Sequence, residues 1–222
     1  MLLAIDASTS SIGIAVYDGN AIIAESNTIS ANRHTVVLAP SVKNLFDTID
    51  VNISKLKGIG VALGPGSFTS LRVGLSFAKG MALGLDIPLI GVPTLDILAA
   101  AQPKNGLPLC AVLQAGREKL AVVFYKTIKE KWVVDRPVTV YTNDTLAEAI
   151  TEPTTVCGEL SSELRTNLRR KNKNIRLASP AMCLRRAGFL AEIAWQHLEK
   201  EDYPNPSGLS PIYLRTENTV PQ

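Results

Sequence analysis

The first residues able to do chemistry are a carboxylate and three hydroxyls near the start of the chain. Asp6 ends the short apolar run 2–6, and Ser8, Thr9 and Ser10 follow it almost directly. A carboxylate can orient a metal-bound water, while hydroxyls and turn amides can bind phosphate oxygens, so this segment is a candidate nucleotide site. The same carboxylate can instead accept hydrogen bonds from its own turn. A role for Asp6 in stabilising its own turn is favoured over a nucleotide site, because the turn lacks the glycine that lets a backbone approach phosphate closely.

A second candidate is the loop 64–67, Gly-Pro-Gly-Ser, which joins an expected strand to an expected helix. Its two glycines permit positive φ angles, and Ser67 can cap the helix that follows. Free amides at such a helix start can bind an anion, with Thr69 and Arg72 close by. A tight connection between a strand and a helix explains the same residues without a ligand, and spacing alone favours that explanation.

Other catalytic arrangements have little support in the sequence. The two histidines, His34 and His197, lie far apart, and neither has a cysteine or histidine at metal-ligand spacing. The sequence therefore predicts no metal site. The three cysteines, Cys110, Cys157 and Cys183, form no CxxC pair, so we expect reduced and mostly buried thiols in a cytosolic protein. The GxxxxGK[ST] phosphate-binding motif is also missing.

Composition excludes several classes of protein. The 222 residues are 46% hydrophobic and 19% charged, which rules out a disordered chain. The net charge of +3 is too small to indicate a dedicated nucleic-acid binder by itself. No apolar stretch is long enough to span a membrane, and the start MLLAIDAS lacks the basic region of a signal peptide. We therefore expect a cytoplasmic protein with no membrane association.

Positive charge is concentrated in one stretch of the second half. Between residues 164 and 191 there are eight cations and no acid. Such a stretch can follow the phosphates of an RNA, whereas a solvated helix face explains each cation taken singly. An RNA contact is therefore a hypothesis for the residues that begin the stretch, which are Arg165, Arg169, Arg170, Lys171 and Lys173.

The expected elements repeat. Strands over 2–6, 12–17 and 21–25, a helix over 35–49, a strand over 56–63 and a helix over 68–85 are followed by a strand over 89–92 and a short helix from 94. The second series has strands over 109–113, 120–125 and 132–140, a helix from 143, a strand over 154–157 and a helix from 161. Ser-Pro at 179–180 predicts the start of a final helix that ends near 200. The order predicts a duplicated α/β fold with lobes 1–103 and 104–222, the final helix and tail packing back toward the first lobe.

The helix expected over 68–85 is apolar nearly all round. Gly74, Ala78 and Ala82 recur at four-residue spacing, and the helix contains three glycines, each of which costs about 1 kcal/mol relative to alanine. Such a helix is buried on more than one face. The second face meets either the same chain or a partner, and the pattern alone does not separate the two.

Residues 4–9 (AIDAST) and 64–74 (GPGSFTSLRVG) together resemble the TsaB (YeaZ) family. Four shorter stretches agree with the family in order, at 33–35, 79–84, 91–95 and 211–215. Two positions depart from its pattern: Ser70 replaces a glycine, and Gln114 stands where the family has an aspartate. The resemblance implies a fold of the actin, hexokinase and Hsp70 (ASKHA) class.

The resemblance also implies a non-catalytic scaffold and activator in the synthesis of threonylcarbamoyladenosine, next to the anticodon of tRNA. It implies pairing with TsaD, the participation of the ATPase TsaE, ATP and metal on those partners rather than on this chain, and a possible homodimer when the chain is alone. Asp6, Ser8, Thr9 and Ser10 would be a vestigial nucleotide site. The expected partner-binding residues are His34, Leu38, Val42, Phe46, Thr69, Arg72, Gly74, Ala78 and Met81. Two alternatives stay open: a small-molecule kinase of the same fold, and an RNA-binding module.

Overall fold

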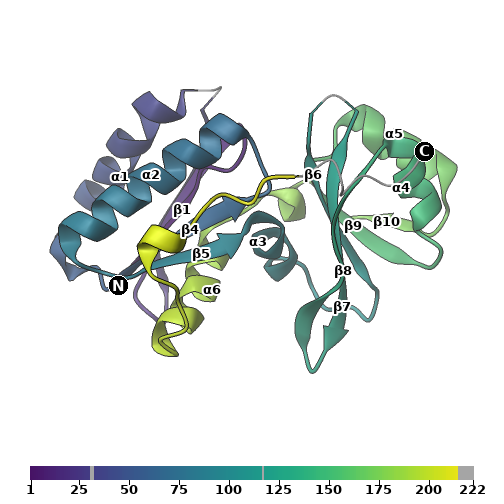
Figure 1. Ribbon diagram of the computed structural model, residues 1–222. Helices are drawn as coiled ribbons and strands as arrows, with labels where there is room; N and C mark the ends of the chain where they lie inside the picture. Colours follow the sequence, from purple (N-terminus) through teal and green to yellow (C-terminus); the bar gives the residue numbers. More distant parts are fainter. Residues whose placement is uncertain (31–32, 117, 215–222) are drawn as a thin grey trace. The chain divides into compact units, whose positions relative to one another are not determined.

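The computed structural model describes residues 1–30, 33–116 and 118–214, which form two compact units (Figure 1). One unit comprises Met1–Ile97 and Arg186–Tyr213, and the other comprises Leu98–Arg185 together with Leu214. Each unit is built on one five-stranded mixed sheet. The last helix of the chain therefore packs in the same unit as the first half of the sequence.

The first sheet has the strand order β3-β2-β1-β4-β5. Its strands are β1 (Leu2–Asp6), β2 (Ser11–Tyr17), β3 (Ile22–Ile29), β4 (Gly58–Gly64) and β5 (Leu89–Pro93). The first three strands are antiparallel, while β1, β4 and β5 run parallel to one another. Because β1 lies at the centre of the sheet, its last residue, Asp6, is held at the carboxyl edge of the sheet.

Helices cover both faces of the first sheet (Figure 1). On one face lie α1 (His34–Ile49) and α2 (Phe68–Leu85), and on the other lies α6 (Ala187–Glu199). The side chains of β1 alternate between these layers, because successive residues of a strand point to opposite faces. Leu3 and Ile5 join the core beneath α1 and α2, whereas Leu2 joins the core beneath α6.

The second sheet repeats the arrangement of the first, with the order β10-β9-β6-β7-β8. Its strands are β6 (Leu109–Gln114), β7 (Leu120–Ile128), β8 (Lys131–Tyr141), β9 (Thr154–Gly158) and β10 (Ile175–Leu177). The helices α4 (Asn143–Ala149) and α5 (Ser162–Lys171) pack on one face. The predicted duplicated fold is confirmed, and β10, which the sequence pattern missed, is the counterpart of β5.

Short elements complete the chain. They are the 3-10 turns η1 (Ile53–Lys55), η2 (Ala181–Cys183) and η3 (Pro206–Gly208), and the helix α3 (Thr94–Ala100). In the tail, the described residues 211–214 are not part of a strand. Ile212 instead donates one backbone hydrogen bond to the Leu63 carbonyl at 2.7 Å. Arg215 lies outside the described residues.

The final helix begins later than the sequence predicts. Ser179 and Pro180 open only the single turn η2, and the chain is extended at Leu184 before α6 begins at Ala187. The reason is Arg185, whose side chain is 5% exposed and pairs with Glu159 at 2.9 Å. A continuous helix from Pro180 would not leave the Arg185 side chain in that buried position.

Candidate functional site

The Asp6 carboxylate is engaged by its own turn. Asp6 is 3% exposed, and its Oδ1 accepts hydrogen bonds from the Ser8 amide at 2.9 Å and from the Ser8 hydroxyl at 2.5 Å. Thr9 is buried as well, while Ser10 is exposed. The same oxygen that would orient a metal-bound water in a nucleotide site thus fixes the turn after β1.

The loop 64–67 packs directly on this turn. The Ser67 amide donates to the Ser8 carbonyl at 2.8 Å, and a side chain at Gly66 would overlap the same carbonyl. Farther along α2, a Cβ at Gly74 would lie 2.9 Å from the Cβ of Ala7. The two stretches that carry the family resemblance, 4–9 and 64–74, therefore pack against each other. Glycine is required at Gly66 and Gly74 because the two stretches lie too close for a larger side chain.

Two hydroxyls in this region make contacts that the sequence does not predict. Ser67 is the N-cap residue of α2, but its side chain makes no capping bond and instead accepts from Ser70 at 3.0 Å. Thr94, the first residue of α3, accepts the Gly64 amide at 3.0 Å. Gly64 has φ +108°, so Thr94 stabilises a backbone conformation that favours glycine. The sequence gives no signal for this contact, because the two residues lie 30 positions apart.

Most of the expected partner-binding residues point into the core of their own unit. His34, Leu38, Val42, Phe46, Gly74 and Ala78 are buried, Met81 is partly buried, and Thr69 and Arg72 are exposed. Ala78 is fully buried between α2 and the sheet. The buried His34 ring lies 3.0 Å from the Ser30 hydroxyl. The close-packed stripe of α2 therefore serves the internal core.

The outer face of α2 carries a different set of residues. Gly80 and Gly84 are exposed, and a Cβ at either would meet no atom within 4 Å, so neither glycine is required by internal packing. A groove of about 480 Å³ lies on one side of this face, between α1 and α2. A second groove, of about 540 Å³, lies on the other side beside Leu83, which is 85% exposed. The first groove is lined in part by Val42, Phe46, Phe77 and Met81.

An exposed aromatic cluster lies at the start of α2. The Arg72 guanidinium lies 4.0 Å from the centroid of the Phe68 ring, and its Nε donates to the Tyr213 hydroxyl at 3.3 Å. The two aromatic rings are 5.1 Å apart. All three side chains are exposed. The sequence pattern did not predict the contact between Tyr213 and the start of α2, because a single exposed aromatic residue gives no periodic signal.

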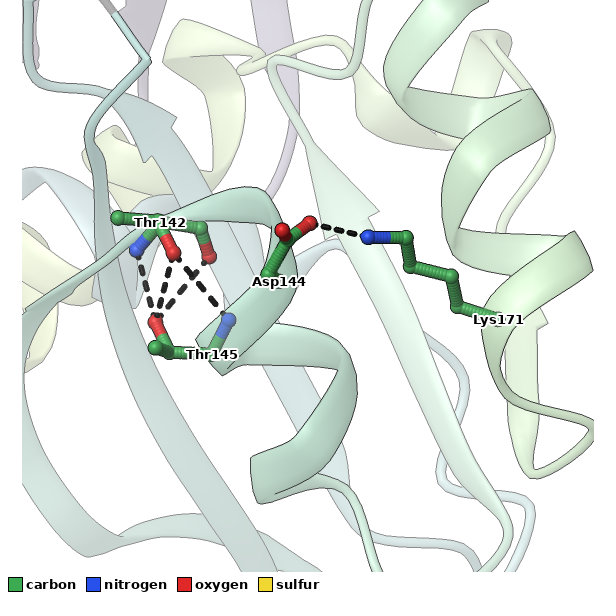
Figure 2. A network of polar contacts seen from close by, with 4 residues as sticks. All are labelled: Thr142, Asp144, Thr145 and Lys171. Atoms are coloured by element: carbon green, nitrogen blue, oxygen red, sulfur yellow. Dashed lines mark hydrogen bonds and ion pairs between the residues drawn. The ribbon is translucent and has the colours of Figure 1, made fainter. Parts of the chain in front are cut away.

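The cations between residues 165 and 176 of the second unit differ in their contacts. Lys171 pairs with Asp144 beside the start of α4, where Thr142 and Thr145 form a capping box (Figure 2). Arg165 donates to the Ala178 carbonyl at 3.0 Å. Arg169, Arg170, Lys173 and Arg176 are exposed, and no ion pair among the described residues includes them. The N-cap residue of α4 is Thr142, whose hydroxyl accepts the Thr145 amide.

Within residues 1–30, 33–116 and 118–214, no group of three or more histidine, cysteine and acidic side chains is placed to hold a metal ion. No helix in the same ranges has the length and apolar character needed to cross a bilayer. Cys110 and Cys157 lie on neighbouring strands and are fully buried, and burial raises the pKa of both thiols.

Solved structures place this architecture in a known class. The chain is similar to YeaZ from Pseudomonas aeruginosa, with a TM-score of 0.75 and 22% identity over 96% of this chain and 99% of that chain. It is also similar to a ROK hexokinase from Thermus thermophilus, with a TM-score of 0.53 and 10% identity over 89% of this chain and 99% of that chain. With its duplicated sheets, the protein has the fold of the actin, hexokinase and Hsp70 (ASKHA) class.

The family model described as "TsaD: tRNA N6-adenosine threonylcarbamoyltransferase" matches residues 22–184. The chain is 41% identical over 99 residues to the tRNA threonylcarbamoyladenosine biosynthesis protein TsaB of Bacillus subtilis, covering 45% of this chain and 43% of that protein. It is 25% identical over 234 residues to TsaB of Haemophilus influenzae, covering 98% of this chain and 94% of that protein. The match spans about half the length of the first curated relatives, 43% to 47%. The chain belongs to this family, and within it to the TsaB (YeaZ) proteins.

Proposed function

We propose that the chain is a non-catalytic scaffold and activator in the synthesis of threonylcarbamoyladenosine on tRNA. The observation that carries this proposal is the exposed, apolar outer face of α2. It is taken together with the similarity of the chain to the TsaB (YeaZ) proteins. Gly80 and Gly84 are exposed glycines that weaken the helix and pack against nothing in their own unit. Apolar grooves flank them, and an apolar surface of this kind is typical of a protein–protein contact.

The proposed partner is TsaD, the tRNA N6-adenosine threonylcarbamoyltransferase. Exposed glycines allow a partner helix to approach the α2 backbone closely, and Met81, Phe77 and Leu83 supply apolar area on both sides. Pairing would stabilise the competent conformation of TsaD, because a partner that binds one conformation more tightly shifts the population toward it. The ATPase TsaE would join this pair. In the absence of TsaD the same face would support a homodimer.

The absence of catalysis by this chain is part of the proposal. It is supported by the Asp6 carboxylate, which accepts two hydrogen bonds from Ser8. It is also supported by Gln114, the last residue of β6 and the counterpart of Asp6 in the second unit, which cannot supply an anionic metal ligand. ATP and metal would therefore act on the partner subunits. The chain would act in the cytoplasm, as part of a complex whose substrate is tRNA.

The test is reconstitution with purified TsaD and TsaE. We expect the wild-type chain to co-purify with TsaD, to be required for modification of a tRNA transcript, and to give no modified nucleoside alone. Gly80→Glu should abolish co-purification while leaving the fold intact, because its side chain enters open space. Gln196→Glu, an exposed change on α6 at the opposite face of the sheet, is the matched control. Modified nucleoside from the chain alone, or ATP-dependent phosphorylation of a sugar, would contradict the proposal.

A further inference from the structure

Four exposed cations lie within eight consecutive positions of the second unit, where α5 leads into its edge strand β10, and are here called the basic corner. It consists of Arg169 and Arg170 in the last turn of α5, Lys173 in the turn that follows, and Arg176 on β10. Because β10 is an edge strand of its sheet, the corner lies at the rim of the unit.

The backbone of the basic corner is fixed in place. The Asn172 side chain donates to the carbonyls of Ala147 and Ile150, at 2.7 and 2.6 Å, which anchors the turn to α4. Its Oδ1 accepts the Asn174 amide at 2.8 Å. Arg176 donates to the Lys173 carbonyl at 2.6 Å. Lys173 is therefore presented to solvent from an ordered turn between the other three cations.

The charge of the basic corner exceeds what the fold needs. Cations in the last turn of a helix interact favourably with its dipole, which accounts for Arg169 and Arg170 but not for Lys173 and Arg176. No ion pair in the described ranges involves any of the four, whereas the neighbouring Lys171 is paired with Asp144 (Figure 2). The sequence from 164 to 191 contains no acid that would neutralise them.

We infer that the basic corner binds the phosphate backbone of tRNA, an inference that rests on the proposed function. Clustered arginines and lysines contact phosphates, fix the position of a nucleic acid and carry no sequence information. The corner contains no aromatic side chain on which a base could stack, so the contact is to the backbone and not to bases. Arg165 and Lys171 are left out of the contact. Arg165 is only partly exposed and bonds both the Ala178 carbonyl and the Cys183 sulfur, and Lys171 is paired with Asp144.

The test compares two triple variants in complex with TsaD. Arg169→Gln/Arg170→Gln/Lys173→Gln removes three charges from the corner, and Lys104→Gln/Lys129→Gln/Lys131→Gln removes three exposed charges elsewhere in the same unit. Binding of a labelled, unmodified tRNA transcript is measured between about 50 and 200 mM salt. The corner variant should bind about tenfold more weakly and lower the slope of log K against log salt by about 2. The control should stay within about twofold of wild type, and co-purification with TsaD should be unchanged in both.

Several outcomes would overturn the inference. One is equal affinity and salt slope for the corner and control variants. Another is wild-type complex that binds tRNA no more tightly than TsaD alone. A third is loss of binding to phosphatidylserine vesicles with no loss toward tRNA, which would assign the corner to a lipid surface. If the wild-type chain fails to pair with TsaD, the proposed function fails by itself, and the same salt series on the isolated chain then decides the role of the corner.

Discussion

Glu25 on β3 and Gly188 in the first turn of α6 are joined by a hydrogen bond of 2.9 Å, in which the Gly188 amide donates to Oε1. The other carboxylate oxygen of Glu25 accepts two bonds from Arg186, at 3.0 and 2.5 Å. A carboxylate at a helix N-terminus satisfies an otherwise unpaired amide and interacts favourably with the helix dipole. Glu25 thus supplies the cap that Arg186, the N-cap residue itself, does not provide.

The first prediction concerns this cap. Glu25→Ala should lower the free energy of unfolding by about 1–2 kcal/mol, since a lost cap and an unpaired amide each cost about that much. Glu25→Gln should recover part of the loss, because the amide oxygen still accepts from Gly188. Urea unfolding measures the effect, and hydrogen exchange at the first amides of α6 locates it. Glu192→Ala, an exposed change on the same helix, is the control, and an equal loss in both would contradict the role of Glu25.

Much of the fold is predictable because apolar alternation and glycine-rich turns are local signals. The same reasoning failed at Pro180, where a local helix-start signal gives only one 3-10 turn. The chain there instead places Arg185 in an ion pair with Glu159, and this pair joins residues 26 positions apart. The cap from Glu25 to α6 is equally invisible, because nothing near Arg186 in the sequence indicates it.

The candidate site was only partly predictable for a related reason. Helical spacing predicted that α2 is buried on more than one face, whereas within its own unit one face packs on the sheet and the outer face, with Gly80 and Gly84, is exposed. Spacing also does not tell which stripe of small residues faces the sheet. The structure assigns Gly74 and Ala78 to the core and leaves Gly80 and Gly84 open. The packing of Ala7 against Gly74 is one contact that separates the two stripes, and it connects segments far apart in the chain.

The second prediction concerns the turn after β1. Asp6→Ala should lower the free energy of unfolding by about 1–3 kcal/mol, because the buried Ser8 amide loses its acceptor. Modification activity of the reconstituted complex should persist below the unfolding temperature of the variant. Magnesium-ATP should give no thermal shift in the wild-type chain alone. A folded Asp6→Ala variant that pairs with TsaD but has no activity would restore the nucleotide-site interpretation.

The third prediction concerns alkaline pH. Burial raises the pKa of Cys110 and Cys157 in the folded protein. Below about pH 8.5 both states keep these protons, but above it the unfolded chain loses them first, so the folded state becomes less stable as pH rises. Each thiol should contribute up to about 1.4 kcal/mol per pH unit above that value. Urea unfolding at several pH values measures this, and Cys110→Ala/Cys157→Ala should flatten the alkaline decline relative to wild type.

The fourth prediction concerns the exposed cluster at the start of α2. Tyr213→Phe removes only the hydrogen bond from Arg72 and should change the free energy of unfolding by less than about 1 kcal/mol. Tyr213→Ala also removes the ring contact with Phe68 and should cost about 0.5–1.5 kcal/mol more. The protease sensitivity of the tail should rise only in the alanine variant. Equal sensitivity in both variants would show that the ring contact does not hold the tail.

The last prediction separates the two stripes of α2. Ala78→Glu places a charge in a fully buried position and should cost several kcal/mol, enough to unfold much of the protein. Gly80→Glu, two residues later, enters open space and replaces a helix-weakening residue, so the free energy of unfolding should stay equal or rise by up to about 1 kcal/mol. Circular dichroism and thermal unfolding compare the variants, and co-purification with TsaD is then measured for the folded ones. We expect Gly80→Glu to be folded and unable to pair. A stable Ala78→Glu chain that loses only its partner would show that the Ala78 stripe is the docking face, and a Gly80→Glu chain that pairs normally would move that face to the exposed residues of α1.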